Sequence, residues 1–204
     1  MSKMDNNIEL EYYPPPDRTK RPPIPLVSST AVRRKWTGTM ADKFIAAMVK
    51  GVSDENIKKW VHELSAFPTR HSKSVHINQV AAWIADRFRE IGYEDVKMHD
   101  YSRQGNQLKN VICTKPGLGS TGQTILLCGH YDCVMEDWGD AASRAPGADD
   151  DATGIAVLLE LARLMAHMKL DDTVQFAAFS GEEQGLWGST AYSQHVKDNN
   201  INII

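Results

Sequence analysis

Three short polar segments of the 204-residue sequence contain the side chains best suited to chemistry. They are residues 129–132 (GHYD), 145–154 (APGADDDATG) and 179–188 (FSGEEQGLWG). All three lie at predicted strand ends, where an open α/β sheet presents side chains to a shared crevice. Imidazole and carboxylate groups without cysteine suit zinc, cobalt or manganese. The segments therefore indicate a metal-dependent site.

The first segment offers one imidazole and one carboxylate. His130 follows the apolar run 125–128, so a neutral imidazole is expected to emerge at the end of a strand. Asp132 lies two residues further on and could orient that ring through its second nitrogen. A lone His-x-Asp pattern is more often structural than metal-binding, so this segment decides nothing by itself.

The second segment places three carboxylates side by side, at Asp149, Asp150 and Asp151. Their mutual repulsion must be offset. Solvent, or capping of the following helix by Asp151 or Thr153, explains one acid well. A divalent cation would stabilise the ionised form of several acids at once.

The third segment pairs Glu182 with Glu183 between glycines. A solvated turn is one explanation of this pair. Alternatively, one glutamate binds a metal and the other removes a proton from a metal-activated water. Three such segments in one chain favour the metal site much more strongly than any one of them.

Hydrophobic periodicity predicts the elements that position these segments. We expect a helical pattern from Ala41, and strands that alternate with further helices. This alternation predicts an α/β fold with a mixed, mostly parallel sheet and helices on both faces. The expected helices cover 53–64, 80–91, 155–168 and 189–197, and the expected strands cover 96–101, 108–114, 124–128 and 173–179.

Composition narrows the class of protein. With 42% hydrophobic and 24% charged residues, the chain is globular rather than disordered. The net charge of −3 gives no field that would draw nucleic acid or an anionic membrane. Residues 1–39 are rich in proline and are expected to be a flexible arm before one domain, 40–204. No signal peptide or membrane span is visible, which predicts a cytoplasmic protein. The three cysteines, Cys113, Cys128 and Cys133, are expected to be reduced, mostly core thiols.

The three segments together resemble the metal-site segments of the two-zinc aminopeptidase family. Relatives in that family include leucine aminopeptidases, glutamate carboxypeptidases and glutaminyl cyclases. The match runs from about Val52 to Lys197 and includes residues 67–70 (FPTR) and 109–112 (KNVI). The resemblance implies a zinc-exopeptidase-like fold and an enzyme that cleaves peptides with a free N-terminus.

The same resemblance implies a role for each site residue. His130 would bind one zinc, Asp150 would bridge both, and Glu183 would bind the other. Glu182 would be the general base for a water shared by the two ions, and Asp132 would support His130. A cis peptide bond after Asp150 is also implied, and cobalt or manganese could replace the two zinc ions.

The family pattern also includes an aspartate and a histidine further along the chain. Residues 201–204 resemble the start of the next strand, so we expect an N-terminal, incomplete catalytic domain that is inactive by itself. His195 follows the third segment but falls in a predicted helix. It is expected at the surface, as are His62, His71, His76, His99 and His167.

Two alternatives stay open at this stage. The first is a related zinc hydrolase of carboxypeptidase or glutaminyl cyclase type. The second is a non-catalytic interaction domain of the same fold, against which the intact Glu182 and Glu183 argue. The pattern gives no indication of the oligomeric state.

Overall fold

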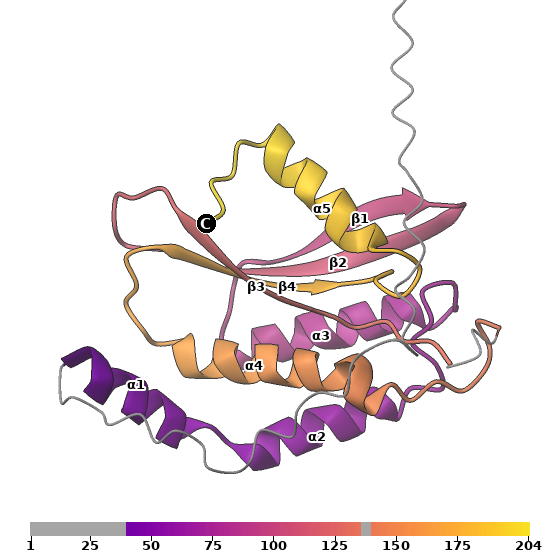
Figure 1. The fold of residues 1–204 in the computed structure, drawn as a ribbon, viewed down its shortest axis with the longest axis horizontal. Helices are drawn as coiled ribbons and strands as arrows, with labels where there is room; N and C mark the ends of the chain where they lie inside the picture. The colour runs from indigo at the N-terminus through magenta and orange to yellow at the C-terminus, as the bar shows by residue number, and fades with distance from the viewer. Residues whose placement is uncertain (1–39, 136–139) are drawn as a thin grey trace, which may run out of the picture. The chain divides into compact units, whose positions relative to one another are not determined.

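The computed structural model describes residues 40–135 and 140–204, so the predicted arm, 1–39, lies outside the described residues. Every predicted helix and strand in the described part is confirmed (Figure 1). The helices are α1 (Met40–Gly51), α2 (Asp54–Ser65), α3 (Ile77–Ile91), α4 (Thr153–Met165) and α5 (Trp187–Asp198). The strands are β1 (Val96–Arg103), β2 (Asn106–Lys115), β3 (Thr124–His130) and β4 (Thr173–Phe179), and an irregular turn covers Ala148–Ala152.

Local sequence signals explain where two of these helices begin and end. The side chain of Ser53 accepts a hydrogen bond from the Asn56 backbone N–H and so caps α2. Helix α3 ends at Gly92, which adopts the left-handed conformation with φ of 111°. Glycine takes this conformation at little cost, which explains the stop.

The four strands form one sheet in the order β1-β2-β4-β3. The sheet is mixed, as predicted, but the expectation that it is mostly parallel is wrong for the described residues, where only β3 and β4 run parallel. The reason is local. Gln104 and Gly105, both with positive φ, form a two-residue hairpin turn between β1 and β2, and such a turn joins only antiparallel strands.

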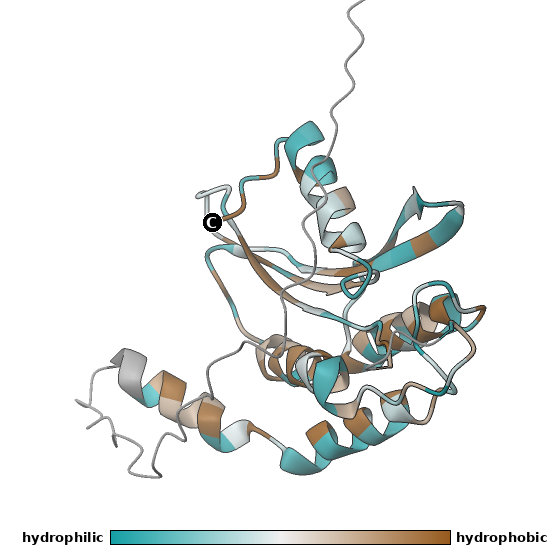
Figure 2. Ribbon diagram, turned by 45° about the vertical axis from the view of Figure 1, so that its right-hand side comes forward, coloured by the Kyte–Doolittle hydropathy of each residue, from teal (hydrophilic) through white to brown (hydrophobic). Residues whose placement is uncertain are grey.

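Helices cover both faces of the sheet, as predicted (Figure 1). Helices α2, α3 and α4 build the main core, in which Phe88, Ile155 and Phe176 are fully buried. Helix α5 covers the opposite face, where Tyr192 packs with Ile112, Ala177 and Phe179. Helix α2, at the bottom of Figure 2, alternates hydrophobic and hydrophilic residues along its length, as a helix with one buried side should.

The last residues pair with the start of β3 at a single point, and the prediction that they begin a further strand stays a prediction. Ile203 forms an isolated parallel bridge with Thr124, whose N–H donates to Asn202 O at 2.8 Å. Cys113 and Cys133 are buried and Cys128 of β3 is exposed, so the three free thiols lie mostly in the core, as expected. In the described residues, no helix has the length and apolar character needed to cross a bilayer.

A candidate metal centre at the ends of the parallel strands

The parallel pairing of β3 and β4 brings two of the three polar segments together. His130 at the end of β3 is the register partner of Phe179 at the end of β4. The backbone continues this contact, because Tyr131 N–H donates to Phe179 O at 2.9 Å. Side chains that follow the two strands must therefore share one edge of the sheet.

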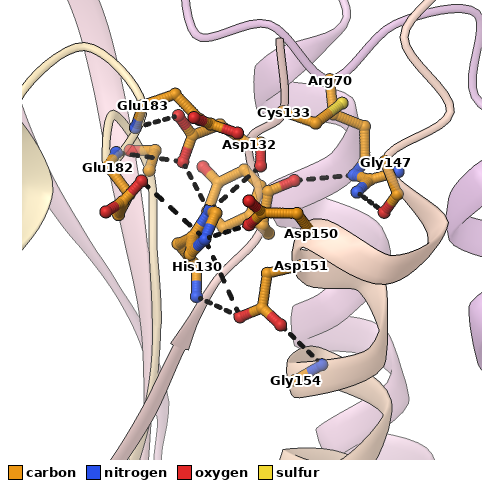
Figure 3. Close-up of polar contacts among 12 residues, drawn as sticks. Arg70, His130, Asp132, Cys133, Gly147, Asp150, Asp151, Gly154, Glu182 and Glu183 are labelled. Atoms are coloured by element: carbon orange, nitrogen blue, oxygen red, sulfur yellow. Dashed lines mark hydrogen bonds and ion pairs between the residues drawn. The ribbon is translucent and has the colours of Figure 1, made fainter. Parts of the chain in front are cut away.

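The imidazole of His130 is surrounded by carboxylates (Figure 3). Its Nδ1 lies 3.2 Å from the backbone oxygen of Asp132 and 3.6 Å from that residue's Oδ1. Its Nε2 lies 3.0 Å from Asp150 Oδ1, 3.9 Å from Glu182 Oε2 and 4.0 Å from Asp151 Oδ2. One ring nitrogen is thus held by its own loop, and the other points at acids from two different segments.

These acids change the titration of the ring. Burial by itself lowers the pKa of His130, but the hydrogen bond and charge of Asp132, with the charges of Glu182 and Asp151, outweigh it and raise the pKa to about 9. Burial also raises the pKa of the Asp151 carboxyl. A field that holds a proton on a buried imidazole attracts a divalent cation to the same place.

The irregular turn before α4 gives its neighbouring aspartates different tasks. Asp151 accepts hydrogen bonds from Gly154 N–H at 2.7 Å and from His130 N–H at 3.2 Å, so it caps α4 as the simpler interpretation predicted. Asp150 has non-helical torsions (φ −107°, ψ 100°) and directs its carboxylate to His130. The Asp150–Asp151 peptide bond is cis, as the family resemblance implies. Capping therefore accounts for Asp151 and leaves Asp150 for other chemistry.

Asp132 connects His130 to the glutamate segment. Its side chain is fully buried, and its two oxygens accept hydrogen bonds from the N–H groups of Glu182 (3.1 Å) and Glu183 (3.2 Å). The Glu183 residue is only 6% exposed. The structure thus brings His130, Asp132, Asp150 and Glu182 together through side-chain distances, and it ties Glu183 to them through its backbone.

Arg70 was given no role by the sequence, yet it organises this site. Its guanidinium is fully buried and donates to Tyr131 O at 2.7 Å, Gly147 O at 2.8 Å, Leu64 O at 3.2 Å and also to Pro146 O. One side chain thereby joins the end of α2, the loop after β3 and the turn that leads to Asp150. Its place in the FPTR motif was the only available signal.

The donor set is incomplete in the part of the chain that the structure describes. Within residues 40–135 and 140–204, no three His, Cys, Asp or Glu side chains are arranged so that they could hold a metal ion by themselves. His130 and Asp150 do offer nitrogen and oxygen donors at one point, which suits zinc. Two cavities, of about 460 and 310 Å³, lie elsewhere, beside Trp83 and Val75.

The prediction that the other histidines lie at the surface is confirmed for only some of them. His62 and His167 are exposed, as expected. His99 and His195 are instead half-buried, with ring centroids 5.1 Å apart, because α5 packs over β1. His71 and His76 are half-buried as well.

The fold is similar to that of solved α/β structures of an aminopeptidase and a glutaminyl cyclase. More specifically, residues 110–204 match the model of peptidase family M28, and the chain is similar over most of its length to curated proteins named as zinc metalloproteases. The chain is 34% identical over 180 residues to a protein of Pyrenophora teres f. teres named "Probable zinc metalloprotease". That alignment covers 79% of this chain and 37% of the relative.

Solved structures agree in fold. The LapA aminopeptidase of Legionella pneumophila superposes with a TM-score of 0.66 at 19% identity, over 81% of this chain and 44% of that one. A glutaminyl cyclase of Fimbriiglobus ruber gives a TM-score of 0.60 at 18% identity, over 74% and 59%. The chain spans about two fifths of the length of the curated relatives that it matches.

Proposed function

We propose that the protein containing this chain is a metallo-aminopeptidase and that residues 40–204 form the first part of its catalytic domain. The observation that carries the proposal is the approach of two segments to one nitrogen. Asp150 Oδ1 and Glu182 Oε2 lie 3.0 and 3.9 Å from His130 Nε2. A candidate metal ligand and a candidate base thus meet at one imidazole.

In this proposal His130, Asp150 and Glu183 would hold the zinc ions. The contact of His130 Nδ1 with Asp132 leaves Nε2 as the nitrogen available to a metal. When bound, zinc would polarise the scissile carbonyl and lower the pKa of a water molecule. Cobalt or manganese could take the same nitrogen and oxygen donors.

Glu182 is the proposed general base. It removes the proton from the attacking water and returns it to the nitrogen of the leaving amine. Its N–H is held by the buried Asp132 carboxylate, which limits how far the backbone beneath the base can move. Asp132 therefore acts on both the ring of His130 and the position of Glu182.

The excess of acids at the site favours a substrate with a free amino group. Asp150, Asp151 and Glu182 all lie within 4.0 Å of one imidazole, and a protonated α-amine would be attracted to them. A carboxypeptidase would instead need a cation for the substrate carboxylate. Arg70 cannot serve, because it is fully buried and already donates to backbone carbonyls. A glutaminyl cyclase is the second candidate, since a structure of that class shares the fold.

We expect further ligands from a strand that would continue the pairing of Ile203 beside β3. Ile203 is level with Thr124 in a parallel register, and β3 reaches His130 six residues later. A strand continued in that register would come level with His130 about six residues beyond Ile203. We propose that the additional carboxylate ligand of the complete protein lies there.

Hydrolysis of aminoacyl chromogenic amides by the complete protein, with metal analysis, tests the proposal. Glu182→Gln should abolish turnover and leave zinc content unchanged, whereas Asp150→Asn should lose zinc. Glu90→Gln, on the exposed side of α3, is the matched control and should change neither. Full turnover in the Glu182 variant would rule out its role as base. Cyclisation of N-terminal glutamine without amide hydrolysis would favour the cyclase.

A further inference from the structure

The loop that carries Glu182 and Glu183 rests on one buried amide. Asn110 of β2 is fully buried, and its Oδ1 accepts a hydrogen bond from Ser180 N–H at 3.2 Å. Its Nδ2 donates to Gly188 O at 2.9 Å. A single side chain thus spans the two ends of the loop 180–188.

The backbone partners fix which way this amide points. A backbone N–H can only donate and a backbone carbonyl can only accept, so the oxygen must face Ser180 and the nitrogen must face Gly188. The same nitrogen lies 3.1 Å from His99 Nδ1. That ring nitrogen must therefore accept, which places the proton of His99 on Nε2 and leaves the ring neutral.

The loop ends are packed too closely to move independently of this amide. A Cβ added to Gly188 would lie 2.3 Å from Asn110 Oδ1 and 2.3 Å from Ser180 O. Gly188 N–H also donates to Ser180 O at 2.9 Å, which closes the loop across its base. The Tyr101 hydroxyl donates to the same oxygen at 2.9 Å. Any shift of Asn110 must therefore shift the base of the loop.

We propose that Asn110 is a positioning residue that sets the place of Glu182 and Glu183 relative to His130. It touches neither the reacting atoms nor a candidate metal ligand, and it acts through the backbone at Ser180 and Gly188. The catalytic part of this inference rests on the proposed function. Its structural part concerns the order of the loop and stands without it.

Three variants separate the contributions of the amide. Asn110→Ala removes both bonds, and Asn110→Asp keeps the shape and the acceptor but places oxygen against Gly188 O and His99 Nδ1. Asn106→Asp is the matched control, because it makes the same chemical change in the β1–β2 hairpin, away from the loop.

Hydrogen exchange of the 204-residue chain measures how well the loop 180–188 is ordered and does not require catalytic activity. In both Asn110 variants, the amides of 180–188 should exchange about tenfold faster or more, which corresponds to about 1.4 kcal/mol of local opening, while β3 and β4 keep their protection. The control should match the parent chain. Unchanged exchange in the loop overturns the proposal, and so does an equal loss of protection across the whole sheet.

Two further readouts separate positioning from general support. Nitrogen NMR should show His99 protonated at Nε2 in the parent chain and at Nδ1 in Asn110→Asp, because the new carboxylate oxygen accepts a hydrogen bond from Nδ1–H. In the complete enzyme, both Asn110 variants should have a kcat about 10- to 100-fold below that of the parent enzyme, with a KM within about twofold of the parent value. An unchanged tautomer or an unchanged kcat overturns the proposal. Absence of hydrolysis in the parent enzyme refutes the proposed function and leaves the exchange test intact.

Discussion

The two halves of the candidate site are held by opposite kinds of side chain. Beneath the segments that supply His130 and Asp150 lies the buried cation of Arg70, which donates to backbone carbonyls of the loops that bear them. Beneath the loop of Glu182 lies the neutral amide of Asn110. A buried cation is stable only where nearby groups offset its desolvation, whereas a satisfied amide needs no such help. The support of the first half, Arg70, is therefore electrostatically tied to the site acids, and the support of the second half, Asn110, is not.

The largest effect should come from breaking the charged half. Arg70→Met leaves four backbone carbonyls without their donor and removes a cation that lies among the acids, so we expect a loss of about 3 kcal/mol or more in the free energy of unfolding. Urea unfolding measures it. Arg103→Met, at the exposed end of β1, should stay within about 0.5 kcal/mol. Equal losses would contradict a special role for Arg70.

A smaller effect should follow from changing the carboxylate that joins the halves. Asp132→Asn replaces one oxygen with an amino group that faces the N–H of Glu182 or Glu183. One donor then lacks a partner in a buried place, so we expect a loss of about 1–3 kcal/mol in urea unfolding. Asp100→Asn, exposed on β1, is the control. A loss no larger than that of the control would show that the two amides do not depend on the charge of Asp132.

Alanine substitutions at Gly188 and Gly185, two glycines of the half supported by Asn110, should differ in how much folding stability they cost. Gly188→Ala puts a methyl group 2.3 Å from Asn110 Oδ1 and Ser180 O, which we expect to cost about 2–3 kcal/mol through displacement of the amide. Gly185 has open space around it but a φ of 107°, so Gly185→Ala should cost about 1 kcal/mol through torsion alone. Thermal unfolding of both variants ranks them, and the opposite order would show that Asn110 is not tightly packed.

The smallest expected effect is the loss of folding stability at acidic pH that comes from His99. Burial, then the charge of His195, lower the pKa of His99, while Asp100 raises it, and Tyr192 and Tyr101 pack on the ring. Since the folded pKa lies below 6.5, this contribution to stability is complete above that pH and is lost as the pH falls further.

His99→Asn isolates this contribution. The asparagine side chain keeps an oxygen acceptor near the position of Nδ1 but does not titrate, so it should flatten the fall in unfolding free energy between about pH 7 and pH 5. Urea unfolding at several pH values measures the slope. An unchanged slope would mean that the amide does not require a neutral His99.

The sequence predicted the elements well, because periodicity, caps and turn residues act locally. Residue types alone could not separate Asp150 from Asp151, because their tasks depend on backbone torsions that bring Asp150 closer to Nε2 of His130 and leave Asp151 to cap α4. The ligand and base roles of the site residues remain predictions. The helix–strand alternation suggested a mostly parallel sheet, although the short connection at Gln104 and Gly105 already required an antiparallel pair.

The two supports were harder to find for a physical reason. Arg70 and Asn110 act on backbone atoms, and most of these lie between 61 and 78 residues away in the chain. Backbone carbonyls and amides are the same for every residue type, so no pattern of letters marks the partner. Only the structure shows that each side-chain nitrogen of Arg70, and both polar atoms of the Asn110 amide, have a backbone partner.

We expect the buried Asp132 carboxylate to affect the order of folding during synthesis on the ribosome as well. Its partners are the amides 50 and 51 residues later, so a nascent chain that ends before Glu182 would bury a carboxylate without its two donors. We therefore expect the turn after β3 to stay open until the glutamate loop has left the exit tunnel, and then to close in one step with β4. Truncated chains of about 180 residues should consequently be more readily cut by proteases than this one.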